Sequence, residues 1–204
     1  MPSSEGETAA SELRGQLRER PLKPNAIAEL LDGLSHEQRV TACRLLGRSE
    51  QRNLYEAVEA FKPLSIEDLV PRSVADFTTV RHFGKNTLPA FTHFEKRFCR
   101  PRQAAEKPEL YGFNFQTMAP VTGPGYFVAR DDSDRREVLV DYCCVPDEHP
   151  ADWPPIRSNE KGLARFVYGF MVDTLRGVSQ HVTIGSAARR GKDLGSWFVL
   201  CREA

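Results

Sequence analysis

The segment from Ser196 to Cys201 constrains the fold more than any other part of this chain, because it is apolar on both faces. A strand sends alternate side chains to opposite sides, which here gives one apolar set on each side: Trp197, Val199 and Cys201 against Phe198 and Leu200. Neither set is stable in water. The strand therefore requires either a covered sheet or a sheet that wraps around an enclosed apolar space, and an enclosed space can form a pocket.

Length and charge narrow the class of protein. A chain of 204 residues is long enough for one domain with appendages. Such a chain buries roughly 70% of its unfolded surface. Lys plus Arg and Asp plus Glu both number 28, so the formal net charge is zero. This balance argues against a nucleic-acid binder that relies on bulk charge.

The cysteines and the N-terminal residues indicate the cellular compartment of such a protein. The five cysteines follow no regular framework, and their odd number favours reduced thiols. The first 20 residues lack the apolar stretch of a secretory signal. No run approaches the ~18 apolar residues of a membrane helix. We therefore expect a soluble protein of the reducing cytoplasm, without membrane insertion.

The first third of the chain is predicted to fold differently from the rest. Residues 1–23 are polar and predict a disordered tail, whereas residues 24–70 predict short helices that pack on a main domain over residues 71–204. Within the helical region, Ser35 and Gln38 have the spacing of a capping box.

From residue 77 onward, the hydrophobic periodicity predicts six elements. They are a strand over 77–83, a helix over 87–98, an extended segment over 111–116, a hairpin over 126–145, a helix over 159–175 and the closing hairpin over 181–201. The C-terminal half thus has the order strand, strand, helix, strand, strand. We expect an α+β fold with an antiparallel sheet of four to five strands, packed by the amphipathic helix and the short N-terminal helices.

Several polar and aromatic side chains are candidates for a pocket wall. His181 begins a strand with Thr183 two residues later, so the two side chains share a face, and a histidine in an apolar site can act as acid, base or ligand anchor. A hydrogen-bonded core histidine is the simpler interpretation. The full set of candidate ligand-binding residues is His181, Thr183, Tyr142, Tyr126, Asn114, Gln116 and Phe198.

The tip of the closing hairpin is basic. Arg189, Arg190 and Lys192 surround Gly191, and an exposed turn of this kind can bind a phosphate or another anion. A solvated tip explains the same residues, since three charges are few beside the contacts that nucleic-acid binders make.

The adjacent pair Cys143 and Cys144 offers a nucleophile but no metal site. On a strand the two thiols point to opposite faces, and the chain has no Cys-x-x-Cys. Residues 147–152 include acidic side chains and a histidine, but their spacing matches no known metal-binding loop. The sequence therefore predicts no metal and identifies no cofactor.

Three functions remain open. The leading hypothesis is a small-ligand-binding or sensory domain whose apolar, aromatic-lined interior takes a small apolar or amphipathic ligand. One alternative is a protein-interaction module that uses the N-terminal helices or the basic hairpin tip to bind a protein partner. The other is a thiol-dependent enzyme with Cys143 or Cys144 as nucleophile and His181 as base.

Overall fold

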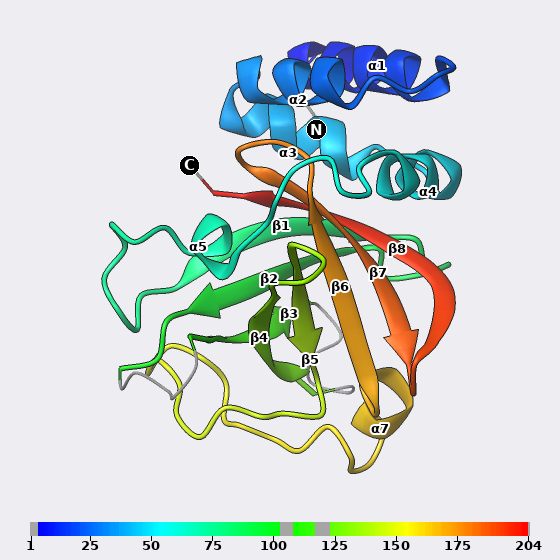
Figure 1. Ribbon diagram of the computed structural model, residues 1–204. Helices are drawn as coiled ribbons and strands as arrows, with labels where there is room; N and C mark the ends of the chain where they lie inside the picture. Colours follow the sequence, from blue (N-terminus) through cyan, green and yellow to red (C-terminus); the bar gives the residue numbers. More distant parts are fainter. Residues whose placement is uncertain (1–3, 103–107, 117–122, 204) are drawn as a thin grey trace.

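The strands form a closed antiparallel barrel with helices against one side (Figure 1). The computed structural model describes residues 4–102, 108–116 and 123–203. Each strand pairs with the next along the chain, and the last closes onto the first. The strands are β1 (Val80–Asn86), β2 (His93–Cys99), β3 (Leu110–Phe115), β4 (Tyr126–Asp132), β5 (Glu137–Asp141), β6 (Met171–Gly177), β7 (Val182–Arg189) and β8 (Lys192–Arg202).

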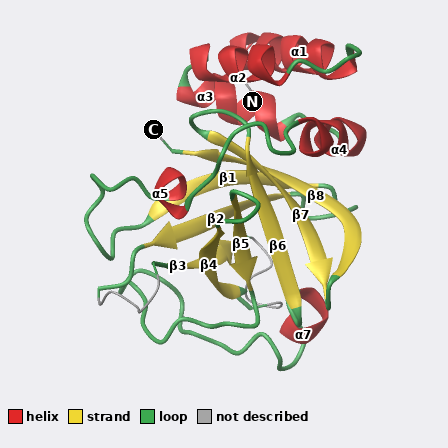
Figure 2. Ribbon diagram, viewed as in Figure 1, coloured by secondary structure: helices red, strands yellow, loops and turns green. Residues whose placement is uncertain are grey.

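Within the described ranges, helices α1 to α4 lie together on the outside of the barrel, and the short helices α5 and α7 lie at its ends (Figure 2). They are α1 (Ser4–Arg18), α2 (Pro24–Gly33), α3 (His36–Arg44), α4 (Arg48–Ala57), α5 (Ile66–Leu69) and α7 (Ala164–Val167). The capping box at the start of α3 is confirmed: Gln38 N donates to Ser35 Oγ at 3.4 Å, and Ser35 N donates to Gln38 Oε1 at 3.0 Å.

Helix α1 occupies most of the stretch for which the sequence predicts a disordered tail. Its Leu13 and Leu17, four residues apart, share one face and are fully buried where α1 packs on α2, α3 and α4. A few apolar residues are enough to hold α1 in place, because the neighbouring helices cover them. The predicted boundaries at residues 23 and 70 stay predictions.

The predicted α+β fold with a four- to five-stranded sheet is wrong, because the sheet has eight strands and closes into a barrel. All of strand β2 except Cys99 lies in the predicted helix over 87–98, and β6 begins in the predicted helix over 159–175. Phe94 and Phe98 are four residues apart, a spacing that fits one face of a helix and one face of a strand equally well. The hydrophobic period therefore did not distinguish the two structures.

The strand predicted over 77–83 continues further than expected, because Gly84 lies within β1. A Cβ atom at Gly84 would come within 2.7 Å of the Phe94 ring and 2.9 Å of Leu200. The glycine marks a close approach of side chains inside the barrel.

The two hairpins are confirmed, with β4 pairing β5 and β7 pairing β8. Both apolar faces of β8 are covered. Phe198 and Leu200 belong to the cluster inside the barrel, whereas Val199 and Cys201 pack under the N-terminal helices. The enclosed interior and the helical cover together satisfy the two-sided burial that the sequence requires.

Short helices lie at opposite ends of the barrel (Figure 1). At one end, Ile66 and Leu69 of α5 join the interior cluster, and the Leu69 carbonyl lies 2.9 Å from His82 Nε2. At the other end, α7 and the following Tyr168 pack against the same cluster.

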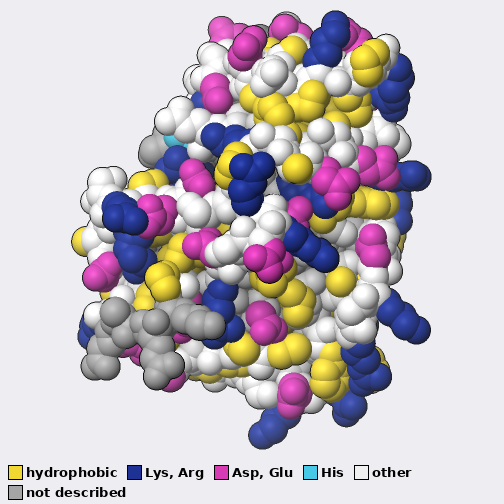
Figure 3. Space-filling model, viewed as in Figure 1, with side chains coloured by type: hydrophobic (Ala, Val, Ile, Leu, Met, Phe, Trp, Pro, Cys, Tyr) yellow, Lys and Arg dark blue, Asp and Glu magenta, His cyan; other side chains and the backbone are white. Residues whose placement is uncertain are grey.

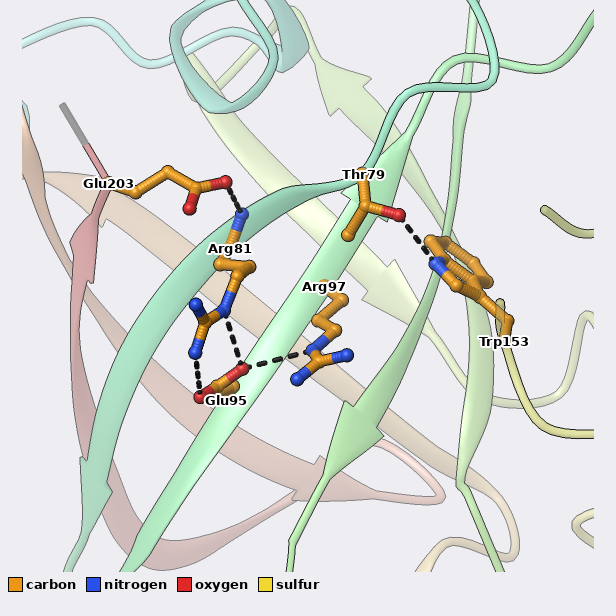
Figure 4. Close-up of polar contacts among 6 residues, drawn as sticks. All are labelled: Thr79, Arg81, Glu95, Arg97, Trp153 and Glu203. Atoms are coloured by element: carbon orange, nitrogen blue, oxygen red, sulfur yellow. Dashed lines mark hydrogen bonds and ion pairs between the residues drawn. The ribbon is translucent and has the colours of Figure 1, made fainter. Parts of the chain in front are cut away.

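Outward-facing side chains of β1 and β2 are paired by charge (Figure 4). The Glu95 carboxylate accepts hydrogen bonds from Arg81 at 2.7 Å and from Arg97 at 2.9 Å. Nearby, Trp153 Nε1 donates to Thr79 Oγ1 at 2.7 Å and pins the loop before α7 to the barrel wall.

Candidate functional site

A buried lysine occupies the inside of the barrel. Glu95 and Arg97, its neighbours in β2, face outward (Figure 4), so the alternation of the strand sends Lys96 inward. Its side chain is 1% exposed. Phe94 and Phe98, two residues away on either side, pack in the same interior cluster.

Three side chains from other strands and turns hold the Lys96 ammonium group. Lys96 Nζ donates to Asp173 Oδ2 at 3.0 Å, to Asn114 Oδ1 at 3.3 Å and to the Tyr142 hydroxyl oxygen. Asn114 Nδ2 donates to the same Tyr142 oxygen at 2.9 Å, and the Tyr142 hydroxyl lies 3.3 Å from Asp173 Oδ2. The four side chains therefore form one connected polar cluster, which we call the Lys96 cluster.

Three aromatic rings also lie close to the ammonium group. Lys96 Nζ lies 4.8 Å from the ring centre of Phe127, 4.9 Å from that of Tyr142 and 5.0 Å from that of Phe198. The negative faces of the rings attract a cation while they exclude water. The rings thus stabilise the charge and shield it on the sides where they lie.

Burial shifts the protonation of all three ionisable members of the cluster. It lowers the pKa of Lys96, and the charge of Asp173 opposes this shift. It raises the pKa of Asp173, against the attraction of Lys96. It also holds the pKa of Tyr142 well above its ordinary value, so the phenol keeps its proton. The amine and the carboxyl group are therefore closer in proton affinity than in water.

One oxygen of the cluster lacks a hydrogen-bond donor. Among the described residues, none donates to Asp173 Oδ1, although the side chain is only 3% exposed. Buried carboxylate oxygens are normally satisfied, and leaving one unsatisfied costs about 1 to 3 kcal/mol or more. Asp173 Oδ1 is thus a buried acceptor that has no donor among the described residues.

A cavity of about 330 Å³ lies beside the Lys96 cluster. Lys96, Asn114, Tyr142 and Asp173 all line it, together with apolar side chains that include Phe94 and Met171. The volume is at the small end of the range of about 300 to 1,000 Å³ that is typical of ligand pockets. A mostly apolar wall with a few convergent polar groups is also typical of such pockets.

The mouth of the cavity has an exposed apolar rim. Leu88, Phe166 and Leu194 line the cavity and are 49%, 75% and 43% exposed. Basic side chains lie beside hydrophobic ones over α7 and the tips of β7 and β8 (Figure 3). Arg189 fixes α7 at this mouth by donating to the carbonyls of Phe166 and Val167 at 2.9 and 3.0 Å.

Two larger hollows lie on the outside of the barrel. One, of about 700 Å³, lies by Phe115 and Trp153, and the other, of about 520 Å³, lies by Ile66 and Arg100. Neither brings a fully buried charged side chain to its wall. The cavity beside the Lys96 cluster is therefore the stronger candidate despite its smaller volume.

The structure brings four of the predicted ligand-binding residues together. Asn114, Gln116, Tyr142 and Phe198 all line the cavity. Gln116 Nε2 donates to the hydroxyl of Tyr168 at 2.7 Å, and the Tyr168 ring stacks on that of Tyr142 at 5.4 Å. These contacts link the polar floor of the cavity to the segment after α7.

The other three predicted ligand-binding residues lie elsewhere. Tyr126 packs on the outside of the barrel against Phe113 and Trp153. His181 precedes β7, where burial and the charges of nearby arginines lower its pKa. Thr183 lies opposite Leu200 in the β7 and β8 pair and is not among the cavity-lining residues.

The three residues of the predicted anion site have different surroundings. Arg189 is committed to the carbonyls of α7, whereas the Arg190 guanidinium stacks over the Phe170 ring at 4.4 Å and Lys192 is exposed. Anion binding at this tip stays a prediction.

The predicted thiol site is not assembled in the described part of the chain. There, no hydrogen bond joins His181 to Cys143 or Cys144. Cys144 Sγ instead donates to Asp141 Oδ2 at 3.3 Å. Among the described residues, no three His, Cys, Asp or Glu side chains gather as they would around a metal ion.

The sequence interpretation missed Lys96 and Asp173, because both lie in segments predicted as helices. Read with a period of two, Lys96 is a lone cation on the side of β2 that carries Phe94 and Phe98. Asp173 is likewise a lone acid between Met171 and Leu175. One charge on an otherwise apolar strand face was the signal that could have found them.

Comparisons of the chain with protein-family models, with curated proteins and with solved structures find no match. Over the described residues, no helix combines the length and the apolar character that crossing a membrane requires.

Proposed function

We propose that the barrel binds a small amphipathic molecule in the cavity beside the Lys96 cluster. The apolar part of the ligand packs against Phe94, Met171 and Phe198, and its polar end reaches the cluster. This proposal keeps the leading sequence hypothesis of a ligand-binding domain and specifies where the ligand is held.

The unsatisfied oxygen Asp173 Oδ1 carries this proposal. A carboxylate oxygen that is buried beside an apolar cavity and lacks a donor favours a ligand that supplies one. The rim supports the same conclusion, because Leu88, Phe166 and Leu194 expose apolar surface where a ligand would enter. Placement in a reducing cytoplasm is part of the proposal, supported by five free cysteines.

Calorimetry with two matched probes tests the proposal. 2-Naphthylmethanol carries a hydroxyl donor on an aromatic body, and 2-methylnaphthalene has almost the same shape without the donor. We expect the alcohol to bind more tightly by about tenfold, which corresponds to one hydrogen bond to a charged group. The Asp173→Asn variant should lose this preference, because its amide is a poorer acceptor.

Two alanines on β7 provide a control for the location of the site. Ala187 lines the cavity, whereas its neighbour Ala188 does not. Ala187→Leu should fill the cavity and abolish binding, and Ala188→Leu should leave binding unchanged. Equal binding of the alcohol to the native protein and to Ala187→Leu would place the ligand elsewhere and overturn the proposal.

A further inference from the structure

We propose that Lys96 forms an imine with a small aldehyde or ketone bound in the cavity. The inference rests on the proposed function, since the cavity must first admit the ligand. It deepens that function by assigning the ligand class, a mostly apolar carbonyl compound, and by giving the barrel a covalent capture step.

The first support is the set of groups that touch the Lys96 nitrogen. Imine formation needs a primary amine, a group that takes protons from it and a group that donates a hydrogen bond to the carbonyl oxygen. Asp173 Oδ2, at 3.0 Å, can take the proton. The Tyr142 hydroxyl contacts both Lys96 and Asp173 and can donate to the oxygen.

The second support is that a ligand in the cavity can reach Lys96, although the Lys96 side chain is almost fully buried. Lys96, Asp173 and Tyr142 all line the cavity, so a carbonyl carbon held there lies beside all three. The rings of Phe127 and Phe198 shield the nitrogen on other sides. The Lys96 side chain is only 1% exposed, and low exposure to water favours the imine, since hydrolysis is the reverse of its formation.

The protonation of the pair makes the amine available as a nucleophile. An amine attacks a carbonyl only when it has lost one proton, and burial lowers the pKa of Lys96 while it raises that of Asp173. Proton transfer across the 3.0 Å contact leaves a neutral amine beside a neutral acid. In a low-dielectric site the neutral pair avoids the cost of burying two charges.

The reaction balances without any further reactant. Asp173 takes one proton from the Lys96 ammonium, the nitrogen lone pair forms the C–N bond, and the carbonyl electron pair moves to oxygen, which takes that proton from Asp173. Asp173 then takes a second proton from nitrogen and passes it to the hydroxyl group. The C–O bond breaks, water leaves, and the product is a protonated imine that still faces the Asp173 carboxylate.

A purely structural ion pair leaves part of the arrangement unexplained. The three hydrogen bonds of Lys96 satisfy its ammonium group. Asp173 Oδ1, in contrast, has no donor among the described residues. The hydroxyl group of the intermediate formed on Lys96 would supply a donor to this oxygen.

Reductive trapping on the native full-length protein tests the step. We would incubate the protein with 2-naphthaldehyde and sodium cyanoborohydride and locate the added naphthylmethyl group by peptide mass spectrometry. The other lysines of the chain serve as internal controls for surface labelling. We expect Lys96 to be labelled at least about tenfold faster than they are, because the cavity holds the aldehyde against its nitrogen.

Two further measurements separate this inference from the proposed function. An excess of 2-naphthylmethanol should suppress labelling at Lys96 and leave surface labelling unchanged. Ala187→Leu should do the same without replacing any member of the Lys96 cluster. If the alcohol binds but Lys96 is labelled no faster than surface lysines, imine formation is overturned while binding stands. If neither the alcohol nor the aldehyde binds, both proposals fall.

Discussion

Lys96 and Asp173 meet inside the barrel at 3.0 Å, although they lie 77 residues apart on β2 and β6. Both side chains are at most 3% exposed. Strands β3, β4 and β5 separate β2 from β6 in the sheet. The curvature of the closed barrel therefore brings the two side chains together. The stability of the fold and the proposed chemistry of the cavity therefore depend on the same contact.

Removing one member of this pair should destabilise the protein strongly. Lys96→Met leaves Asp173 buried without a countercharge, and we expect a loss of about 3 to 5 kcal/mol in the free energy of unfolding, measured by urea denaturation. The double variant Lys96→Met/Asp173→Leu should recover much of this loss, because no buried charge remains. A double variant as unstable as the sum of its single variants would show that the two groups are not coupled.

Acid should weaken the fold through His82. Burial lowers the pKa of His82 from 6.5 to about 3, so the folded protein excludes a proton that the unfolded chain takes up below pH 6.5. The free energy of unfolding should therefore fall as the pH drops from 6.5 toward 3, by up to about 1.4 kcal/mol per pH unit from this residue.

The difference between native protein and His82→Gln isolates this effect, since the acidic residues titrate in both. Urea denaturation at several pH values should give a shallower pH dependence for the variant. Parallel curves would mean that His82 is protonated equally in the folded and unfolded states.

The rim should affect binding without affecting stability. Phe166 and Leu163 are both largely exposed and lie in or next to α7, but only Phe166 lines the cavity. Phe166→Ser should weaken the binding of 2-naphthylmethanol by several-fold, and Leu163→Ser should leave it unchanged. Because both side chains are in water, neither substitution should shift the melting temperature. Equal effects of the two substitutions on affinity would remove Phe166 from the site.

The thiols should react in an order set by burial. Cys143 is exposed, but partial burial and the charge of Asp141 raise its pKa, so a disulfide reagent at pH 7 should label it first and slowly. Cys99, whose pKa burial raises to about 12, should react only on unfolding. Rapid labelling of Cys143 or Cys144 at neutral pH would instead revive the thiol-enzyme hypothesis.

Helix α1 should contribute to stability despite its polar composition. Leu13 is fully buried and Glu12, its neighbour, is exposed. Leu13→Ala should cost about 2 to 5 kcal/mol in urea denaturation, whereas Glu12→Ala should change little. A small effect of Leu13→Ala would mean that α1 is only loosely held against α2, α3 and α4.

The sequence predicted only some of the residues of the candidate site. Tyr142 and Phe198 lie in segments whose period is clear, and the sequence placed both on a pocket wall. Lys96 was hidden because Phe94 and Phe98 fit either a helix or a strand. Asp173 was hidden in the same way, since Met171 and Leu175 are also four residues apart.

The sequence by itself determined the features that depend on neighbouring residues, namely the capping box at Ser35, the two hairpins and the burial of both faces of β8. Only the tertiary structure decided that the sheet closes and that Lys96 reaches Asp173. Side-chain alternation indicates which residues share a face of the sheet. It does not indicate how many strands the sheet has or which strand closes the barrel. Closure turned one apolar face of β8 into the wall of a cavity, and it placed two isolated charges within hydrogen-bonding distance.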